Sequence, residues 1–441
     1  MHNADMDPTS SHRRIEPVYR AFDGSGEIIV YQGPLTLTTA QQEHTATGQL
    51  ELRLAPTTEL VVRLIEDEVM LGLQLQNQST AVAIPEGSPL DPPEPLDLRT
   101  PPDDTDAMDP SLPLNHIQVG HVEDAERYIM HISGALRAML PSVTVEDGMQ
   151  PQLEFVLPEW RLTLAPVFRP KGDNDFSYVI AATPLSRPTN VGMLEELRWR
   201  TFILLSLVAG REIGVGPTCG IDTENRVVWL ETGAPRLRAG KPGVAWCPRH
   251  LVASAIPTLA HGFAALSDEA TVKILDRAIG HLLAAGGGEV LDIRIPMATA
   301  GLELISWSIL QQRGWLDTDA LSRLPAAART RLLLQWAGIP VEIPDAFRAL
   351  SARRSRVGRA DWGGPEVLFN VRNALVHPPK RSDEPGWPHS DELLESWQLA
   401  TWYLELTVLR VLGYNGSYWS RLRLGRWATD VEPVPWARDQ Q

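Results

Sequence analysis

Apolar and polar residues alternate in several short stretches of the first half of the chain. These stretches begin at Glu27, Gly48, Glu59, Gln152, Trp160 and Phe176. A period of two, bounded by Gly, Pro and polar turns, is typical of half-buried β-strands. One helix-like stretch, residues 123–140, interrupts the series. We therefore expect a β-rich region over residues 1–192.

The pattern becomes helical from Ser267 onward. Ser267 and the two acidic residues after it form a good N-cap and first turn, and apolar positions then recur every three or four residues. A second helix, with Pro296 near its start, ends at Gly314. Further helices are expected over residues 326–336, 368–377 and 390–413. Single apolar stripes and short connections predict an all-α bundle of four or five helices over residues 267–437.

The segment between these regions, residues 193–266, shows no single period. A buried helix is predicted for "MLEELRWRTFILLSLVAG", and turns are predicted for "REIGVGPTCGID". A chain of 441 residues is expected to hold two or three domains. The predicted fold class is therefore α+β and multi-domain: a β-rich N-terminal region, a mixed connecting segment and a C-terminal helical bundle.

The composition is that of a soluble, core-forming protein, with 43% hydrophobic and 22% charged residues. The longest apolar run, "FILLSLVAG", is far shorter than the roughly 20 residues that a membrane span requires. No signal-peptide pattern begins the chain. Two cysteines, Cys219 and Cys247, suit a reducing compartment. We expect a cytoplasmic protein without membrane contacts.

The net charge of −15 is unevenly distributed, because residues 267–441 carry 20 basic and 21 acidic side chains. The preceding residues therefore hold a net charge of −14. Residues 85–113, rich in proline and acidic residues, are expected to form an exposed loop. An acidic surface repels nucleic acid, so the N-terminal domain is expected to sense a protein or small ligand, or to restrain the C-terminal half.

Standard catalytic motifs are absent from the chain. There is no HExxH, no GxSxG, no complete P-loop or dinucleotide fingerprint, and no Cys/His cluster with zinc-site spacing. We expect neither a metal site nor a bound cofactor.

The stretch "LFNVRNALVHPPKR" (residues 368–381) contains both core-packing positions and candidate catalytic residues. Apolar residues form one helical stripe, while Arg372, Asn373 and His377 lie outside it. Cleavage of RNA through its 2′-hydroxyl needs a base for that proton and a cation for the charge on phosphorus. Histidine and arginine supply these two groups. On a regular helix Asn373 and His377 share a face, but Arg372 lies about 140° from His377. The alternative is that Arg372 pairs with a carboxylate and His377 only caps the helix.

Other residues could extend this site. Arg348 and the arginines after it form a run without an acidic residue, and Glu303 lies in an otherwise apolar helix. The run could bind RNA phosphates or be a solvated loop. Glu303 could orient His377, pair with Arg372 or lie at the surface. Tyr414, Tyr418 and Trp419 are candidates for base stacking. The weaker RNA-binding candidates are Arg353, Arg354, Arg356, Arg359, Lys380 and Arg381.

The sequence "VRNALVHP" resembles the Arg-polar-x3-His motif of HEPN domains, which are helical-bundle ribonucleases of prokaryotic defence and toxin systems. Three further segments are similar to the Apea-like branch of that family: "GLELISWSIL", "WYLELTVLRVLGYNGSYWSRL" and "VPWA". Together they cover roughly residues 267–437, about two fifths of the chain.

This resemblance implies a metal-independent endoribonuclease of the anti-phage or toxin type, with two Arg/His pairs facing each other in a homodimer. It assigns catalysis to Arg372 and His377, with Asn373 as the polar residue after the arginine. One departure is Pro379, which stands where nucleotidylation-linked HEPN proteins have a tyrosine, and this disfavours an antitoxin partner. The competing hypothesis is a HEPN bundle that binds RNA or protein without catalysis.

Overall fold

The computed structural model divides the chain into two compact units. The first holds residues 1–155, 159–202 and 213–240, and the second holds residues 156–158, 203–212 and 241–441. The residues that the structure describes are 15–20, 27–40, 42–54, 58–64, 80–91, 112–134, 152–167, 176–235, 245–288, 290–377, 386–422 and 430–440. Most of the predicted acidic loop, residues 92–111, lies outside them.

The first unit contains a five-stranded antiparallel sheet in the order β4-β1-β2-β3-β5. Its strands are β1 (Glu27–Thr38), β2 (Glu43–Arg53), β3 (Glu59–Leu64), β4 (Ala81–Ala83) and β5 (Leu112–Leu114). The alternating stretches at Glu27, Gly48 and Glu59 all lie in these strands, as predicted. Their inward-facing Leu, Ile and Val residues belong to one hydrophobic core.

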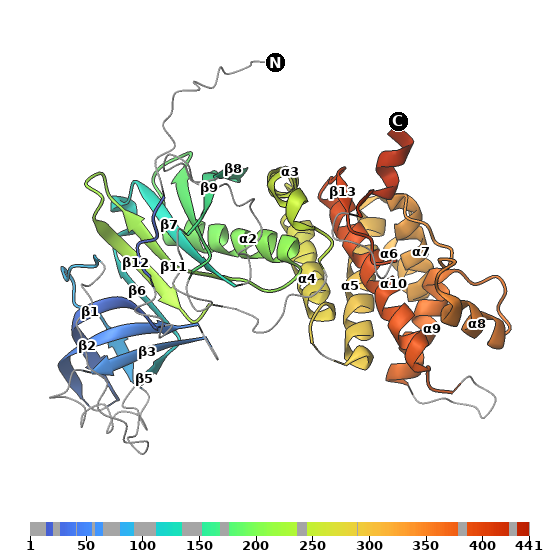
Figure 1. Cartoon of the computed structure of the whole chain (residues 1–441), viewed down its shortest axis with the longest axis horizontal. Coiled ribbons are helices and arrows are strands. Elements are labelled where there is room, and N and C mark those ends of the chain that lie inside the picture. Colours follow the sequence, from blue (N-terminus) through green and yellow to red (C-terminus); the bar gives the residue numbers. More distant parts are fainter. Residues whose placement is uncertain are drawn as a thin grey trace. The chain divides into compact units, whose positions relative to one another are not determined.

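A second sheet has seven strands in the order β6-β12-β11-β7-β10-β9-β8. They are β6 (His116–Gly120), β7 (Arg127–Ser133), β8 (Leu153–Leu157), β9 (Trp160–Pro166), β10 (Tyr178–Pro184), β11 (Gly214–Ile221) and β12 (Val227–Gly233). Residues of one face, such as Ile129 and Leu230, belong to the core that the five-stranded sheet also lines. Helix α2 (Val191–Ala209) begins on the opposite face (Figure 1). There Arg198 bonds to Glu231 of β12.

Two predictions for this region were wrong. The helix expected over residues 123–140 is replaced by the strand β7, and residues 135–140 lie outside the described part of the chain. The turns expected around "GVGPTCGI" are the strand β11. Both strands are buried on both faces, so they lack the alternation that marks a half-buried strand. The register of β11 shifts between Val215 and Thr218, so Gly216 and Pro217 are accommodated at a bulge.

The second unit is a helical bundle. Its principal helices are α4 (Glu269–Ala285), α5 (Leu291–Gln312), α7 (Ala326–Ala337), α9 (Gly364–Val376) and α10 (Ser390–Val411), which confirms the five predicted helices. Shorter helices are α3 (Val252–Ala265), α6 (Thr318–Arg323) and α8 (Arg348–Arg356). The N-cap of α4 is Asp268, one residue later than predicted, and its carboxylate accepts from the Thr271 N–H at 2.9 Å.

Helices α5 and α10 form the centre of the bundle, since α5 packs against α4, α7, α9 and α10. By length and composition α5 could cross a membrane, but over half of its most apolar window is buried inside the bundle. It starts at Leu291, five residues before Pro296. Close approach of α3 to the end of α10 requires Gly262, because a Cβ there would collide with the Leu412 carbonyl oxygen.

The region predicted as a connecting segment, residues 193–266, is divided between the two units. Strands β11 and β12 belong to the seven-stranded sheet, while α3 belongs to the bundle. The fold is thus mixed α+β, with a β-rich N-terminal region and a helical C-terminal region, as the sequence predicted.

Candidate functional site

Helix α9 carries Arg372 and Asn373. Pro365 occupies its first turn, and the Glu366 carboxylate accepts from the Gly363 N–H at 3.0 Å, which caps the helix start. Val367, Leu368 and Val371 are buried in the bundle. This packing fixes the helix, and Arg372 and Asn373 lie at the edge of the buried stripe.

His377 is not part of the helix. Its backbone is extended, with φ −130° and ψ 131°, although its N–H still donates to the Asn373 carbonyl at 2.9 Å. The following Pro378 explains this conformation, because a proline disfavours the α region for the residue before it. The helical-wheel angle between Arg372 and His377 therefore does not apply. The imidazole is exposed at the carboxyl end of α9.

Glu303 of α5 faces Arg372, which confirms one of the alternatives predicted for it. Arg372 Nη2 lies 3.4 Å from Glu303 Oε1, and Arg372 Nη1 donates to Asn373 Oδ1 at 3.1 Å. The side chains of Arg372 and Glu303 are each 29% exposed. Glu303 Oε1 is buried and accepts no hydrogen bond from the described residues, so its contact with Arg372 is an ion pair without a hydrogen bond.

A second arginine, Arg329 of α7, approaches the same carboxylate. Its Nη2 lies 3.9 Å from Glu303 Oε2. Arg329 Nη1 donates to the Leu324 and Leu321 carbonyls at 2.7 and 3.2 Å, and its guanidinium lies 5.5 Å from the Trp307 ring centroid. No local pattern in the sequence points to Arg329, since its helix is far from residue 372 along the chain. Two guanidinium groups around one carboxylate leave a net positive charge, which suits an anionic ligand.

The expectation that Arg353 contacts RNA at the surface was wrong. Its side chain is 1% exposed, and it donates from Nε to Asn370 and from Nη1 to Glu392, both at 2.8 Å. Arg356 bonds to the other oxygen of Glu392. Burial opposes ionisation of Glu392, but the hydrogen bonds from Arg356 and Arg353 outweigh it and lower the pKa of that carboxyl. A buried guanidinium with carboxylate and amide partners joins helices and does not meet solvent.

The other arginines of the run are only partly available to bind RNA. The run forms α8 and the turn after it, so the alternative of a solvated loop was wrong for α8. Arg354 Nη1 donates to the Trp362 carbonyl at 3.2 Å. Arg359 is exposed, with its guanidinium 5.8 Å from the Trp362 ring centroid. Lys380 and Arg381 lie outside the described residues.

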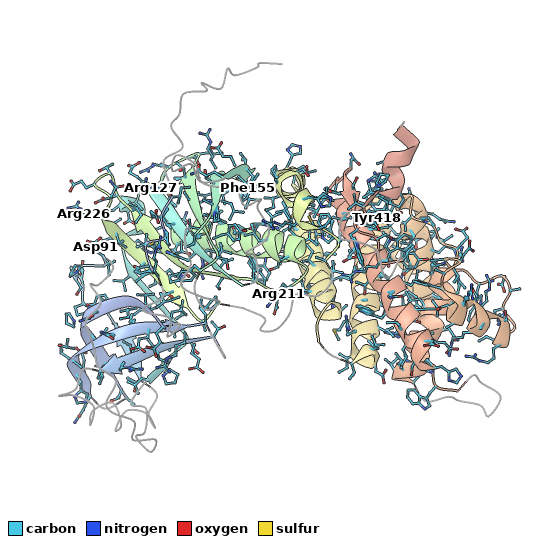
Figure 2. All side chains as sticks on the ribbon, in the orientation of Figure 1. Asp91, Arg127, Phe155, Arg211, Arg226 and Tyr418 are labelled. Atoms are coloured by element: carbon cyan, nitrogen blue, oxygen red, sulfur yellow. The ribbon has the colours of Figure 1, made fainter. Side chains whose placement is uncertain are left out.

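Two of the aromatic residues proposed for base stacking are buried. Tyr414 is 2% exposed and Tyr418, labelled in Figure 2, is 1% exposed. The Tyr418 hydroxyl accepts from Trp402 and donates to Glu432, each at 2.9 Å. These contacts identify both rings as core of the bundle, and Trp419 is half-buried.

In the described part of the chain, no three His, Cys, Asp or Glu side chains lie close enough together to form a metal site.

Residues 268–432 match the family model described as the YopA C-terminal domain. The chain is also similar to the SPbeta prophage-derived uncharacterized protein YopA of Bacillus subtilis (strain 168), with 25% identity over 250 residues. That match covers 55% of this chain and about half, 53%, of the relative. No solved structure matches the chain.

Proposed function

We propose that the helical unit is a metal-independent endoribonuclease of the HEPN type, with Arg372 and His377 as its catalytic residues. The observation that carries the proposal is the placement of both groups at one end of α9. Arg372 is partly exposed and forms an ion pair, without a hydrogen bond, with Glu303, and His377 is exposed directly beyond the helix. The resemblance of residues 267–437 to Apea-like HEPN sequences supports the same assignment.

In the proposed reaction, the His377 imidazole accepts the proton of a ribose 2′-hydroxyl. The 2′-oxygen then forms a bond to the adjacent phosphorus, and the bond from phosphorus to the 5′-oxygen breaks. Arg372 stabilises the charge on the phosphoryl oxygens, and the departing 5′-oxygen takes up a proton. The products are a 2′,3′-cyclic phosphate and a 5′-hydroxyl.

The neighbours of Arg372 have positioning roles in this scheme. Asn373 Oδ1 and Glu303 hold the guanidinium from two sides, while its Nε has no hydrogen-bond partner among the described residues. Arg329 offsets the charge of Glu303, which would otherwise repel a phosphate. Arg354 and Arg359 extend the cationic surface only weakly.

A second copy of the chain would complete the site, because each chain supplies one Arg372/His377 pair. We therefore expect a homodimer formed through the helical unit. In this proposal the protein acts in the cytoplasm as a defence or toxin effector, and the acidic β-rich unit senses the trigger. The prophage origin of the similar protein agrees with a role in phage biology.

The test is cleavage of a 5′-labelled RNA by the purified full-length protein in excess EDTA, with the product ends identified by mass spectrometry. We expect cleavage without added metal and 2′,3′-cyclic phosphate or 3′-phosphate ends. Light scattering on the same sample is expected to report a dimer. Activity that requires Mg²⁺, or products with 3′-hydroxyl ends, would contradict the mechanism.

The second candidate function is a bundle that binds RNA or protein without catalysis. Its support is the contact between Arg372 and Glu303, since a guanidinium paired with a carboxylate can serve helix packing alone. A protein that binds RNA and leaves it intact, with an affinity unchanged by His377→Ala, would favour this function.

A further inference from the structure

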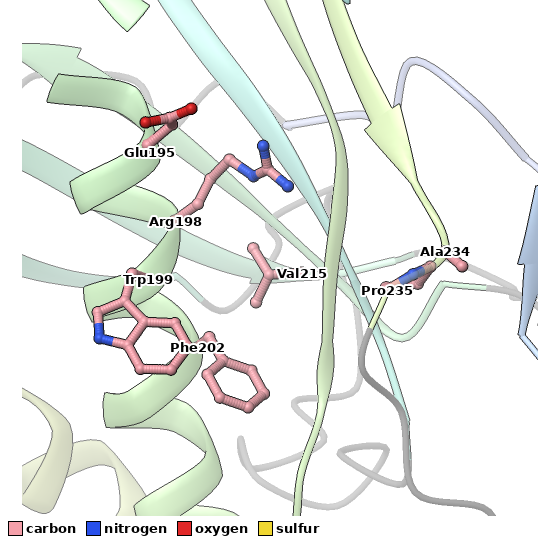
Figure 3. A pocket seen from close by; sticks show the side chains of 7 residues that line it. All are labelled: Glu195, Arg198, Trp199, Phe202, Val215, Ala234 and Pro235. Carbon is pink, nitrogen blue, oxygen red and sulfur yellow. The ribbon is translucent and has the colours of Figure 1, made fainter. Parts of the chain in front are cut away.

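The first unit contains a pocket of about 300 Å³ between α2, strand β11 and the two residues that follow β12 (Figure 3). This volume is at the lower end of the range for small-molecule sites. Arg198 extends from α2 toward the strands. Val215 faces the rings of Trp199 and Phe202, which also lie on α2. The lining residues are Glu195, Arg198, Trp199, Phe202, Val215, Ala234 and Pro235.

One part of the pocket wall is polar and is backed by the buried Glu231 carboxylate. Arg198 Nη1 donates to Oε1 of Glu231, whose side chain is 4% exposed, and His116 Nε2 lies 3.0 Å from the same oxygen. Burial and the nearby Arg198 lower the pKa of His116. Arg198 Nε and Glu231 Oε2 are buried and have no hydrogen-bond partner within the described residues.

The other part of the wall is apolar and largely aromatic. Trp199 and Phe202 lie one helical turn apart, with ring centroids separated by 5.4 Å and ring planes at 31°. Phe202 and Val215 are each 8% exposed, and Trp199 is half-buried. Two tilted rings beside a valine offer a surface on which a planar ring can stack.

The charged side chains at the pocket determine which planar ligands can bind. Arg198 and Glu231 neutralise each other, and Glu195 adds one negative charge on the turn of α2 before Arg198. A ligand that carries its own negative charge is therefore disfavoured. Glu195 and Arg198 are three positions apart, so a carboxylate and a guanidinium lie side by side on the helix. These two side chains can form hydrogen bonds with an uncharged ligand edge that presents donors and acceptors together.

We infer that this pocket binds an uncharged purine nucleoside, with its base stacked on Trp199 and Phe202. Guanine fits the polar wall best, because its O6 accepts from a guanidinium while its N1–H and exocyclic amine, on the same edge, donate to a carboxylate. Adenine presents one donor and one acceptor on the corresponding edge, and cytosine offers a smaller ring for stacking. The inference is independent of the ribonuclease proposal, since every residue involved belongs to the first unit.

Equilibrium dialysis of the full-length protein against radiolabelled guanosine tests this inference. We expect a Kd of about 1 mM or tighter, with adenosine and cytidine weaker. Trp199→Ala and Arg198→Gln are each expected to weaken binding at least about tenfold, through loss of stacking and of the guanidinium. Arg200→Gln is the matched control, because Arg200 pairs with Glu196 and does not line the pocket.

Arg198→Gln removes the partner of a buried carboxylate, so melting temperatures are measured for all variants. If that variant is unfolded, Trp199→Ala decides the outcome. The inference is overturned if guanosine does not bind up to its solubility limit, or if Trp199→Ala binds it as well as Arg200→Gln does. Tighter binding of GMP or benzoate than of guanosine would overturn the assignment of an uncharged ligand.

Discussion

Two clusters in the helical unit use the same three residue types in different surroundings. Arg353 meets Asn370 and Glu392, while Arg372 meets Asn373 and Glu303. In the first cluster both arginine bonds are 2.8 Å and the arginine is 1% exposed. In the second the ion pair is 3.4 Å long and the arginine is 29% exposed.

The difference separates a structural arginine from one that can meet a substrate. A buried charge must be paired and hydrogen-bonded, so the Arg353 cluster is closed and connects α8, α9 and α10. The Arg372 cluster lies where solvent can reach it. A second arginine meets the carboxylate in both clusters, Arg356 at Glu392 and Arg329 at Glu303, so net charge does not distinguish them. Identical residue types therefore do not imply an identical role; exposure and bond geometry decide.

The largest expected effect on stability comes from breaking the closed cluster. Arg353→Met leaves Glu392 buried with one fewer partner, so the free energy of unfolding should fall by about 3–5 kcal/mol. Arg372→Met, the matched variant on the exposed cluster, should lower it by less than about 1 kcal/mol. Urea denaturation followed by helical circular dichroism measures both. Equal losses for the two variants would remove the distinction between the clusters.

The RNA cleavage rate, unlike the stability, should depend strongly on Arg372. Arg372→Lys keeps the positive charge but loses the planar fork that matches phosphate oxygens. We expect the RNA cleavage rate to fall by roughly 10²-fold, with an unchanged melting temperature. Single-turnover cleavage beside a thermal melt checks this. A variant that cleaves at the wild-type rate would assign Arg372 to helix packing.

A smaller effect is expected at Asn373, which accepts from Arg372 and takes no proton. Asn373→Ala should reduce the cleavage rate by about tenfold, because the guanidinium loses one of its two supports. Asn373→Asp keeps an acceptor at this position and serves as the control. A defect larger than that of His377→Ala would show that the roles are assigned wrongly.

The helices of the bundle were predictable because each has one apolar stripe and a clear end signal. Gly338, for example, ends α7 in a left-handed conformation that favours glycine. Strands β7 and β11 were not predictable from alternation, because both of their faces are buried. A buried strand of this kind resembles a helix or a turn until its neighbours are known.

The candidate site was predictable only in part. Arg372, Asn373 and His377 are close in sequence, and the lone Glu303 in an apolar helix is a possible partner for Arg372. The burial of Arg353 and the approach of Arg329 depend on which helices meet in the bundle. Nothing in the local sequence around either arginine reports such tertiary contacts.

The most direct test of the central claim is single-turnover RNA cleavage in EDTA by the wild-type protein and by His377→Ala. His377 is exposed beyond the end of α9, so its loss should leave the melting temperature unchanged. We predict a rate at least roughly 10²-fold lower for the variant, as expected when a general base is removed. Equal cleavage by two equally folded proteins would contradict the assignment of His377 and with it the proposed catalytic pair.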